Sequence, residues 1–166
     1  MAAEEYSVAA MKRTLLWLGA LMVSLAAGVA TAQVISLTGT WYLNVEKSQW
    51  GSMRKPASEA LEIQHREPAL QYHGTVTYSN EETRDFAFEG SIDGKEYAMT
   101  RSFGTGTITL RRTDPFTIES IFKTTDGAYV ENARTIVSRD GKTLTRRLRT
   151  QSPEGVKTWT EIWERR

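Results

Sequence analysis

Short segments of alternating polarity, separated by tight-turn residues, fill the chain from residue 39 to its C-terminus. Apolar and polar residues alternate with a period of two, which is typical of half-buried β-strands and not of helices. Asp-Gly pairs at 93–94, 126–127 and 140–141 indicate hairpin turns, because both residue types tolerate positive φ. No gap holds the dozen residues that a parallel crossover needs, so successive strands should pair as antiparallel neighbours.

The pattern predicts an all-β fold, an antiparallel up-and-down β-barrel of eight to ten strands. Closure into a barrel is expected because it removes exposed strand edges. A β-sandwich is the alternative, since strand spacing alone does not separate the two architectures. After a first strand beginning at Gly39, the expected strands are 59–66, 69–79, 82–91, 95–102, 105–112, 116–124, 128–138, 142–151 and 157–165.

The N-terminus has the three parts of a secretory signal peptide. Met11-Lys12-Arg13 is a basic start, residues 15–29 are almost all apolar, and Ala30-Thr31-Ala32 supplies the small residues before a cleavage site. The apolar run is short for a membrane span of about 20 residues, which favours cleavage after Ala32 over a retained anchor. Met11 is a candidate for the true start of translation.

Residues 1–32 are therefore expected to be a signal peptide, and residues 33–166 a single barrel domain. The expected localisation is periplasmic or secreted, with no stable membrane span after cleavage. The formal net charge is only +1, so no global basic field would recruit nucleic acid or an anionic membrane. The chain has no cysteine, which excludes disulfides, thiolate catalysis and cysteine-bound metals.

The first strand carries a recognisable motif. The motif begins with Gly39-Thr40-Trp41 and continues through Leu43, Asn44, Lys47, Ser48, Trp50 and Gly51. It resembles the start of bacterial exported lipocalin-like proteins, within the lipocalin and fatty-acid-binding-protein group (calycins). The turn at 93–95 and the segment 138–144 also resemble that group. The resemblance implies that Trp41 caps one barrel end against a basic residue of a late strand, with Arg165, Arg147 and Arg149 as candidates.

The chain also departs from that group. It lacks the cysteines common in animal lipocalins, its first connector is too short for the helical lid of fatty-acid-binding proteins, and no C-terminal helix follows the last strand. The resemblance therefore implies an open or loosely plugged barrel and a hydrophobic or amphipathic ligand.

Alternation also predicts which polar residues face the interior. On the strand at 128–138, Val130, Asn132, Arg134 and Ile136 are expected to share the inner face. An anionic head could bind Arg and Tyr side chains, and a tail could lie on aromatic residues, an arrangement that the resemblance also implies. The expected ligand-binding residues are Tyr72, Arg84, Phe86, Phe88, Arg101, Arg112, Arg134, Arg146 and Trp159.

A second interpretation of the inward arginines is purely structural. A buried guanidinium without a partner is costly, so these arginines could instead pair internally with Glu161, Glu131 or Asp85. A slip of one residue at a bulge would also reverse a strand's faces. The last strand places Trp159 and Trp163 on one face with Glu161 between them, which favours a core role for the tryptophans.

The sequence offers little for catalysis or metal binding. It has no Gly-x-Ser-x-Gly elbow and no phosphate-binding glycine loop, and its two histidines, His65 and His73, are expected on opposite strand faces. No catalytic residue, metal or cofactor is therefore assigned. The expected function is that of an exported binding protein for a small hydrophobic or amphipathic ligand. An anionic amphipathic ligand is one option. The alternatives are a ligand-free envelope protein-interaction module and a small-molecule isomerase working in the cavity.

Overall fold

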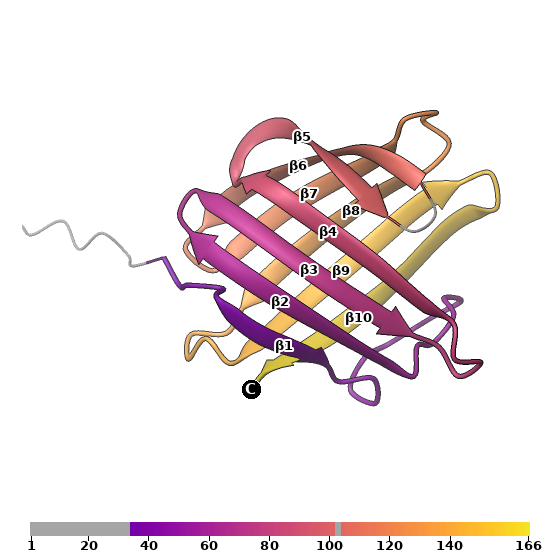
Figure 1. Ribbon diagram of the computed structural model, residues 1–166, viewed down its shortest axis with the longest axis horizontal. Helices are drawn as coiled ribbons and strands as arrows, with labels where there is room; N and C mark the ends of the chain where they lie inside the picture. Colours follow the sequence, from indigo (N-terminus) through magenta and orange to yellow (C-terminus); the bar gives the residue numbers. More distant parts are fainter. Residues whose placement is uncertain (1–33, 102–103) are drawn as a thin grey trace, which may run out of the picture. The chain divides into compact units, whose positions relative to one another are not determined.

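The computed structural model describes residues 34–101 and 104–166, which form a closed antiparallel barrel (Figure 1). The barrel order is β1-β10-β9-β8-β7-β6-β5-β4-β3-β2, so every strand pairs with its sequence neighbours and β1 closes the ring against β10. This topology confirms the predicted barrel and excludes the sandwich. The strands are β1 Gly39–Leu43, β2 Ser58–Arg66, β3 Ala69–Thr77, β4 Thr83–Ser91, β5 Asp93–Arg101, β6 Gly104–Asp114, β7 Thr117–Thr124, β8 Val130–Val137, β9 Thr143–Ser152 and β10 Gly155–Arg165.

Two of the three Asp-Gly pairs form hairpin turns as the sequence predicts, and the third lies at the start of a strand. Gly94, Gly127 and Gly141 have φ of 79°, 70° and 68°, in the region that only glycine adopts readily. The turns at 126–127 and 140–141 join β7 to β8 and β8 to β9, while Asp93 and Gly94 open β5 beside an irregular stretch of its pairing with β6. Tight turns of this kind allow only up-and-down pairing between successive strands.

One end of the barrel is closed by tryptophan packing. Trp41 and Trp163 are completely buried, and they pack in one apolar core with Leu37, Val137 and Leu144. The Trp41 indole donates a hydrogen bond to the carbonyl oxygen of Leu37, at 2.8 Å. The segment before β1 therefore crosses this end of the barrel and plugs it.

Arg165 is the basic residue that covers Trp41. Its guanidinium carbon lies 4.5 Å from the centre of the Trp41 ring, and its Nη2 donates to the carbonyl oxygen of Ser36 at 2.6 Å. This contact confirms the expected pairing of Trp41 with a late-strand arginine and selects one of the three candidates. The β1–β10 register explains the choice, because it sets Trp41 directly opposite Arg165.

One predicted strand face is wrong. On β8 the buried residues are Glu131, Ala133 and Val137, whereas Arg134 is exposed on the outside of the barrel. Each face of β8 carries both apolar and polar residues, so the sequence pattern did not distinguish them. Pairing with β9 decides the orientation, because it sets Ala133 against Leu148 and Val137 against Leu144.

The expected signal peptide at residues 1–32 lies outside the described residues. Within residues 34–101 and 104–166, no helix is long and apolar enough to cross a membrane.

Candidate functional site

A cavity of about 390 Å³ lies inside the barrel, beside the plugged end. Its wall is mostly apolar and comes from inward residues of nearly every strand, for example Leu61, Met99 and Leu110. At the other end, the wall includes Met53, Arg54 and Pro56 of the connector between β1 and β2. Ligand pockets usually measure about 300–1,000 Å³, so the cavity is large enough for a small molecule.

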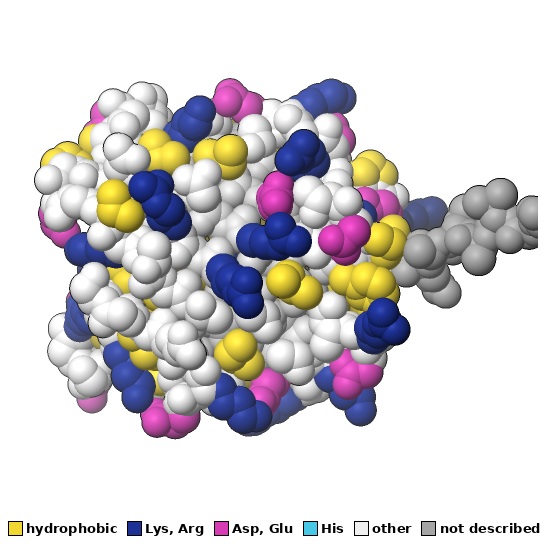
Figure 2. Space-filling model, turned by 180° about the vertical axis from the view of Figure 1, so that it is seen from behind, with side chains coloured by type: hydrophobic (Ala, Val, Ile, Leu, Met, Phe, Trp, Pro, Cys, Tyr) yellow, Lys and Arg dark blue, Asp and Glu magenta, His cyan; other side chains and the backbone are white. Residues whose placement is uncertain are grey.

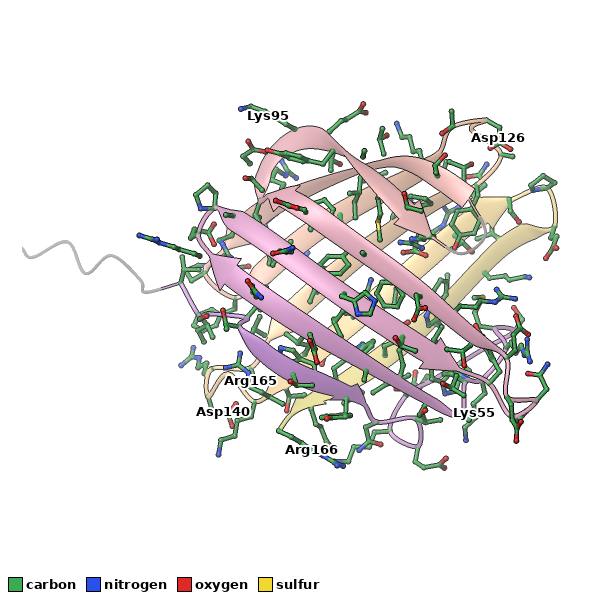
Figure 3. The ribbon with its side chains drawn as sticks, in the orientation of Figure 1. Lys55, Lys95, Asp126, Asp140, Arg165 and Arg166 are labelled. Carbon is green, nitrogen blue, oxygen red and sulfur yellow. The ribbon has the colours of Figure 1, made fainter. Side chains whose placement is uncertain are left out.

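The two ends of the barrel differ in construction. Arg165 and the β8–β9 turn at Asp140 lie at the plugged end, whereas Lys55 and the β7–β8 turn at Asp126 lie at the opposite end (Figure 3). Arg54 lines the cavity there while about half of its side chain is exposed to solvent. The cavity therefore extends to the molecular surface at the connector end.

Arg101 and Glu131 form a buried ion pair in the cavity wall. Nη1 and Nη2 of Arg101 donate to the two carboxylate oxygens of Glu131 at 3.0 and 2.9 Å, and the Tyr129 hydroxyl donates to the same carboxylate at 2.9 Å. Burial alone would raise the pKa of Glu131, but the charge and hydrogen bonds of Arg101 lower it below its usual value. Glu131 is therefore an ionised partner of Arg101.

Arg146 and Glu161 form a second ion pair in the cavity wall. Nη1 of Arg146 donates to Glu161 at 3.0 Å, and the indole nitrogens of Trp159 and Trp163 donate to the two oxygens of the same carboxylate at 2.8 and 3.1 Å. Burial lowers the pKa of Arg146, but the charge of Glu161 outweighs it and the pKa is raised overall. Glu161 thus receives three donors, as a buried carboxylate requires.

These two pairs confirm the structural interpretation of the inward arginines for Arg101 and Arg146. Glu131 and Glu161, two of the three carboxylates considered as partners, are the ones observed. Asp85 instead accepts a hydrogen bond from Thr75.

Most of the expected ligand-binding residues do meet in one place. Those that line the cavity are Tyr72, Arg84, Phe86, Arg101, Arg146 and Trp159. Tyr72 and Phe86 make an edge-to-face contact with ring centres 6.2 Å apart, which forms an aromatic part of the wall. Arg84 lies toward the connector end, where it forms an ion pair of 2.6 Å with Glu82.

Three expected residues lie elsewhere. Phe88 is 3% exposed within the core, against Tyr72 and Tyr97, and is not part of the cavity wall. Arg112 forms an ion pair of 2.7 Å with Glu67. Arg112 faces inward, as predicted, but its ion pair with Glu67 lies next to the β2–β3 turn and outside the cavity.

Arg134 lies on the outer surface, 3.5 Å from Glu119. It borders a shallow groove across β6–β9 that also involves Arg111, Arg147 and Arg149. Figure 2 shows Lys and Arg side chains scattered over this face of the barrel. Arg134 therefore cannot contact a molecule in the cavity without unfolding of β8.

Glu59 is a charged cavity residue that sequence reasoning missed. It lines the cavity at the start of β2, two residues before Leu61. The alternation that places Leu61 and Ile63 inward extends back to Glu59, so a usable signal was present. Burial, followed by the charge of Glu161, raises the pKa of Glu59 to about 8.

The described part of the chain contains no group of three or more His, Asp or Glu side chains arranged to hold a metal ion. His65 faces inward and His73 outward, which confirms the predicted split. The His65 ring accepts a hydrogen bond from the Leu37 backbone nitrogen at 3.2 Å and contacts Glu67 at 2.7 Å. This histidine therefore has a structural role at the plugged end.

Comparison with known proteins identifies the fold. Neither a protein-family model nor a curated protein sequence matches the chain. Among solved structures, zebrafish ileal bile acid-binding protein in complex with cholic acid has a TM-score of 0.53 and 14% sequence identity, over 79% of this chain and all of that one. Rv2717c from M. tuberculosis gives 0.49 and 16%, over 78% of this chain and 92% of that one. The chain therefore shares a closed antiparallel barrel fold with the zebrafish bile acid-binding protein, which agrees with the lipocalin-like barrel that its first-strand motif predicts.

Proposed function

We propose that this protein binds a small hydrophobic or amphipathic molecule inside its barrel. The observation that carries the proposal is the mostly apolar cavity of about 390 Å³, which reaches the surface at the connector end. A barrel built only as a scaffold would fill this space with side chains, because empty apolar volume costs stability. The similar barrel of the zebrafish protein holds cholic acid, which supports the same class of use here.

The proposal includes export. The basic, apolar and small-residue parts of residues 11–32 support a periplasmic or secreted carrier or sequestering protein. Fractionation of the native cells should place the protein outside the cytoplasm, and N-terminal sequencing should begin at Gln33. A cytoplasmic protein that retains residues 1–32 would contradict this part of the proposal.

Native mass spectrometry of protein purified from its own cells tests the binding proposal. We expect a fraction of the protein to carry one non-covalent adduct of a few hundred daltons. Ser120→Phe should abolish the adduct, because Ser120 lines the cavity, whereas Ile121→Phe should retain it, because Ile121 is exposed on the outer face of the same strand. Equal adduct levels in both variants would refute binding in the cavity.

A further inference from the structure

The Glu59 carboxyl group lies in the cavity wall without a protein partner. Within residues 34–101 and 104–166, no hydrogen bond or ion pair reaches it, in contrast to Glu131 and Glu161 nearby. Glu59 is half-buried, and its carboxyl group opens to the cavity and not to a protein partner. A group on a bound molecule would complete it.

The charges of the cavity indicate which group that would be. The wall holds two arginines in internal ion pairs, Arg101 with Glu131 and Arg146 with Glu161, and these charges cancel. Glu59 is a third carboxylate in the same space. Ionised Glu59 would have no hydrogen-bonded cation of its own, and a positive charge on a ligand would supply one.

The arginines around Glu59 make their hydrogen bonds to other groups and none to Glu59. Arg54 and Arg84, at the connector end, both bond Glu82, at 2.7 and 2.6 Å. Arg146 attracts Glu59 across the cavity without a hydrogen bond to it. The titratable or charged groups that face the cavity around Glu59 are Arg54, Tyr72, Tyr78, Arg84, Asp85, Arg101, Tyr129, Glu131, Arg146 and Glu161.

We infer that the cavity selects amphiphilic amines, with the Glu59 carboxylate accepting hydrogen bonds from the ligand ammonium group while the apolar wall holds its hydrocarbon part. This inference rests on the proposed function. An anionic ligand is the less favourable occupant, because its head would have to displace Glu131 or Glu161 from an arginine and would leave that carboxylate buried and unpaired.

Binding of an amine should also release a proton. With a pKa of about 8, Glu59 is mostly protonated in the empty cavity at pH 7. A cation placed beside the carboxyl group favours its ionised form, so the proton passes to the solvent as the ion pair forms. We expect close to one proton released per amine bound at pH 7, and none for a neutral ligand.

Isothermal titration calorimetry with three probes of equal chain length tests the inference. Protein purified from its own cells is titrated with decylamine, decanol and decanoate in phosphate and in Tris at pH 7, because the difference between these buffers reports proton release. The variants are Glu59→Gln and, as a matched control, Glu62→Gln, an exposed carboxylate on the outer face of the same strand.

The inference requires decylamine to bind at least about ten-fold more tightly than decanol or decanoate, the usual effect of a charge-assisted hydrogen bond. Glu59→Gln should remove this advantage and the proton release, and Glu62→Gln should change neither. Tighter binding of decanoate than of decylamine, or an unchanged amine preference in Glu59→Gln, would overturn the inference and leave the proposed function intact. Failure of all three probes to bind would overturn both.

Discussion

The raised pKa of Glu59 should make the stability of the protein fall as pH rises. Between its usual pKa of 4.5 and its folded value of about 8, folded Glu59 holds a proton that the unfolded chain has released. The contribution of protonated Glu59 to the free energy of unfolding is fully present below pH 4.5, and it is lost as the pH rises through about 8. Glu59→Gln removes the titration and keeps the shape of the side chain.

The size of the effect follows from these values. One pKa unit corresponds to about 1.4 kcal/mol. About two pH units of the range between the unfolded and folded pKa values of Glu59 lie above pH 6. Wild type should therefore lose about 3 kcal/mol of unfolding free energy relative to Glu59→Gln between pH 6 and pH 9. Groups far from Glu59 titrate equally in both proteins and cancel in the difference.

Urea denaturation at pH 6, 7, 8 and 9 measures this difference directly. Glu62→Gln is the control and should follow wild type at every pH, because that carboxylate is exposed. A difference between wild type and Glu59→Gln that stays constant to within about 0.5 kcal/mol from pH 6 to pH 9 would refute the burial and charge argument for Glu59.

Three further substitutions test the framework around the cavity by urea denaturation. Trp41→Ala should cost about 3–5 kcal/mol, because a completely buried indole and its hydrogen bond are lost. Gly106→Ala should cost about 1–3 kcal/mol, because a Cβ on β6 would collide with the backbone carbonyl oxygen of Lys123 on β7. Arg101→Met should cost about 3–5 kcal/mol by leaving Glu131 buried and unpaired, and Arg101→Met with Glu131→Leu should recover most of that loss.

Each of these three predictions has a result that would contradict it. Near-wild-type stability of Trp41→Ala would contradict its role in plugging the barrel. Unchanged stability of Gly106→Ala would contradict the close approach of β6 and β7. A double variant at 101 and 131 that is as unstable as the single one would show that the cost of Arg101→Met does not arise from an unpaired carboxylate.

The fold was predictable from the sequence because the alternation within the strands and the turns between them indicate the same architecture. Alternation gave the strands, and the Asp-Gly turns around Gly127 and Gly141 restricted β7–β9 to neighbouring hairpins. The motif at Trp41 pointed to a plugged barrel end. The identity of its partner required the β1–β10 register, which sets Arg165 opposite Trp41.

The site was predictable only in part, because its charges depend on contacts between distant strands. Sequence alternation correctly placed Arg101 and Arg146 inside, but their carboxylate partners lie 30 and 15 residues away along the chain. On β8 the two faces have similar composition, so Arg134 was expected inside and Glu131 was not. Glu59 was missed because it stands at the very start of its strand, where the alternation has little support.

The central claim is that the barrel interior is a binding cavity, and fluorescence titration with the neutral probe Nile red tests it most directly. The wild-type protein should bind one probe per chain with a strong rise and blue shift in emission, and Ile121→Phe should behave identically. Ser120→Phe, which fills the cavity from the same strand, should lose this binding while its thermal unfolding remains cooperative. Absence of saturable one-to-one binding to the wild type, or equal binding by a folded Ser120→Phe variant, would contradict the account.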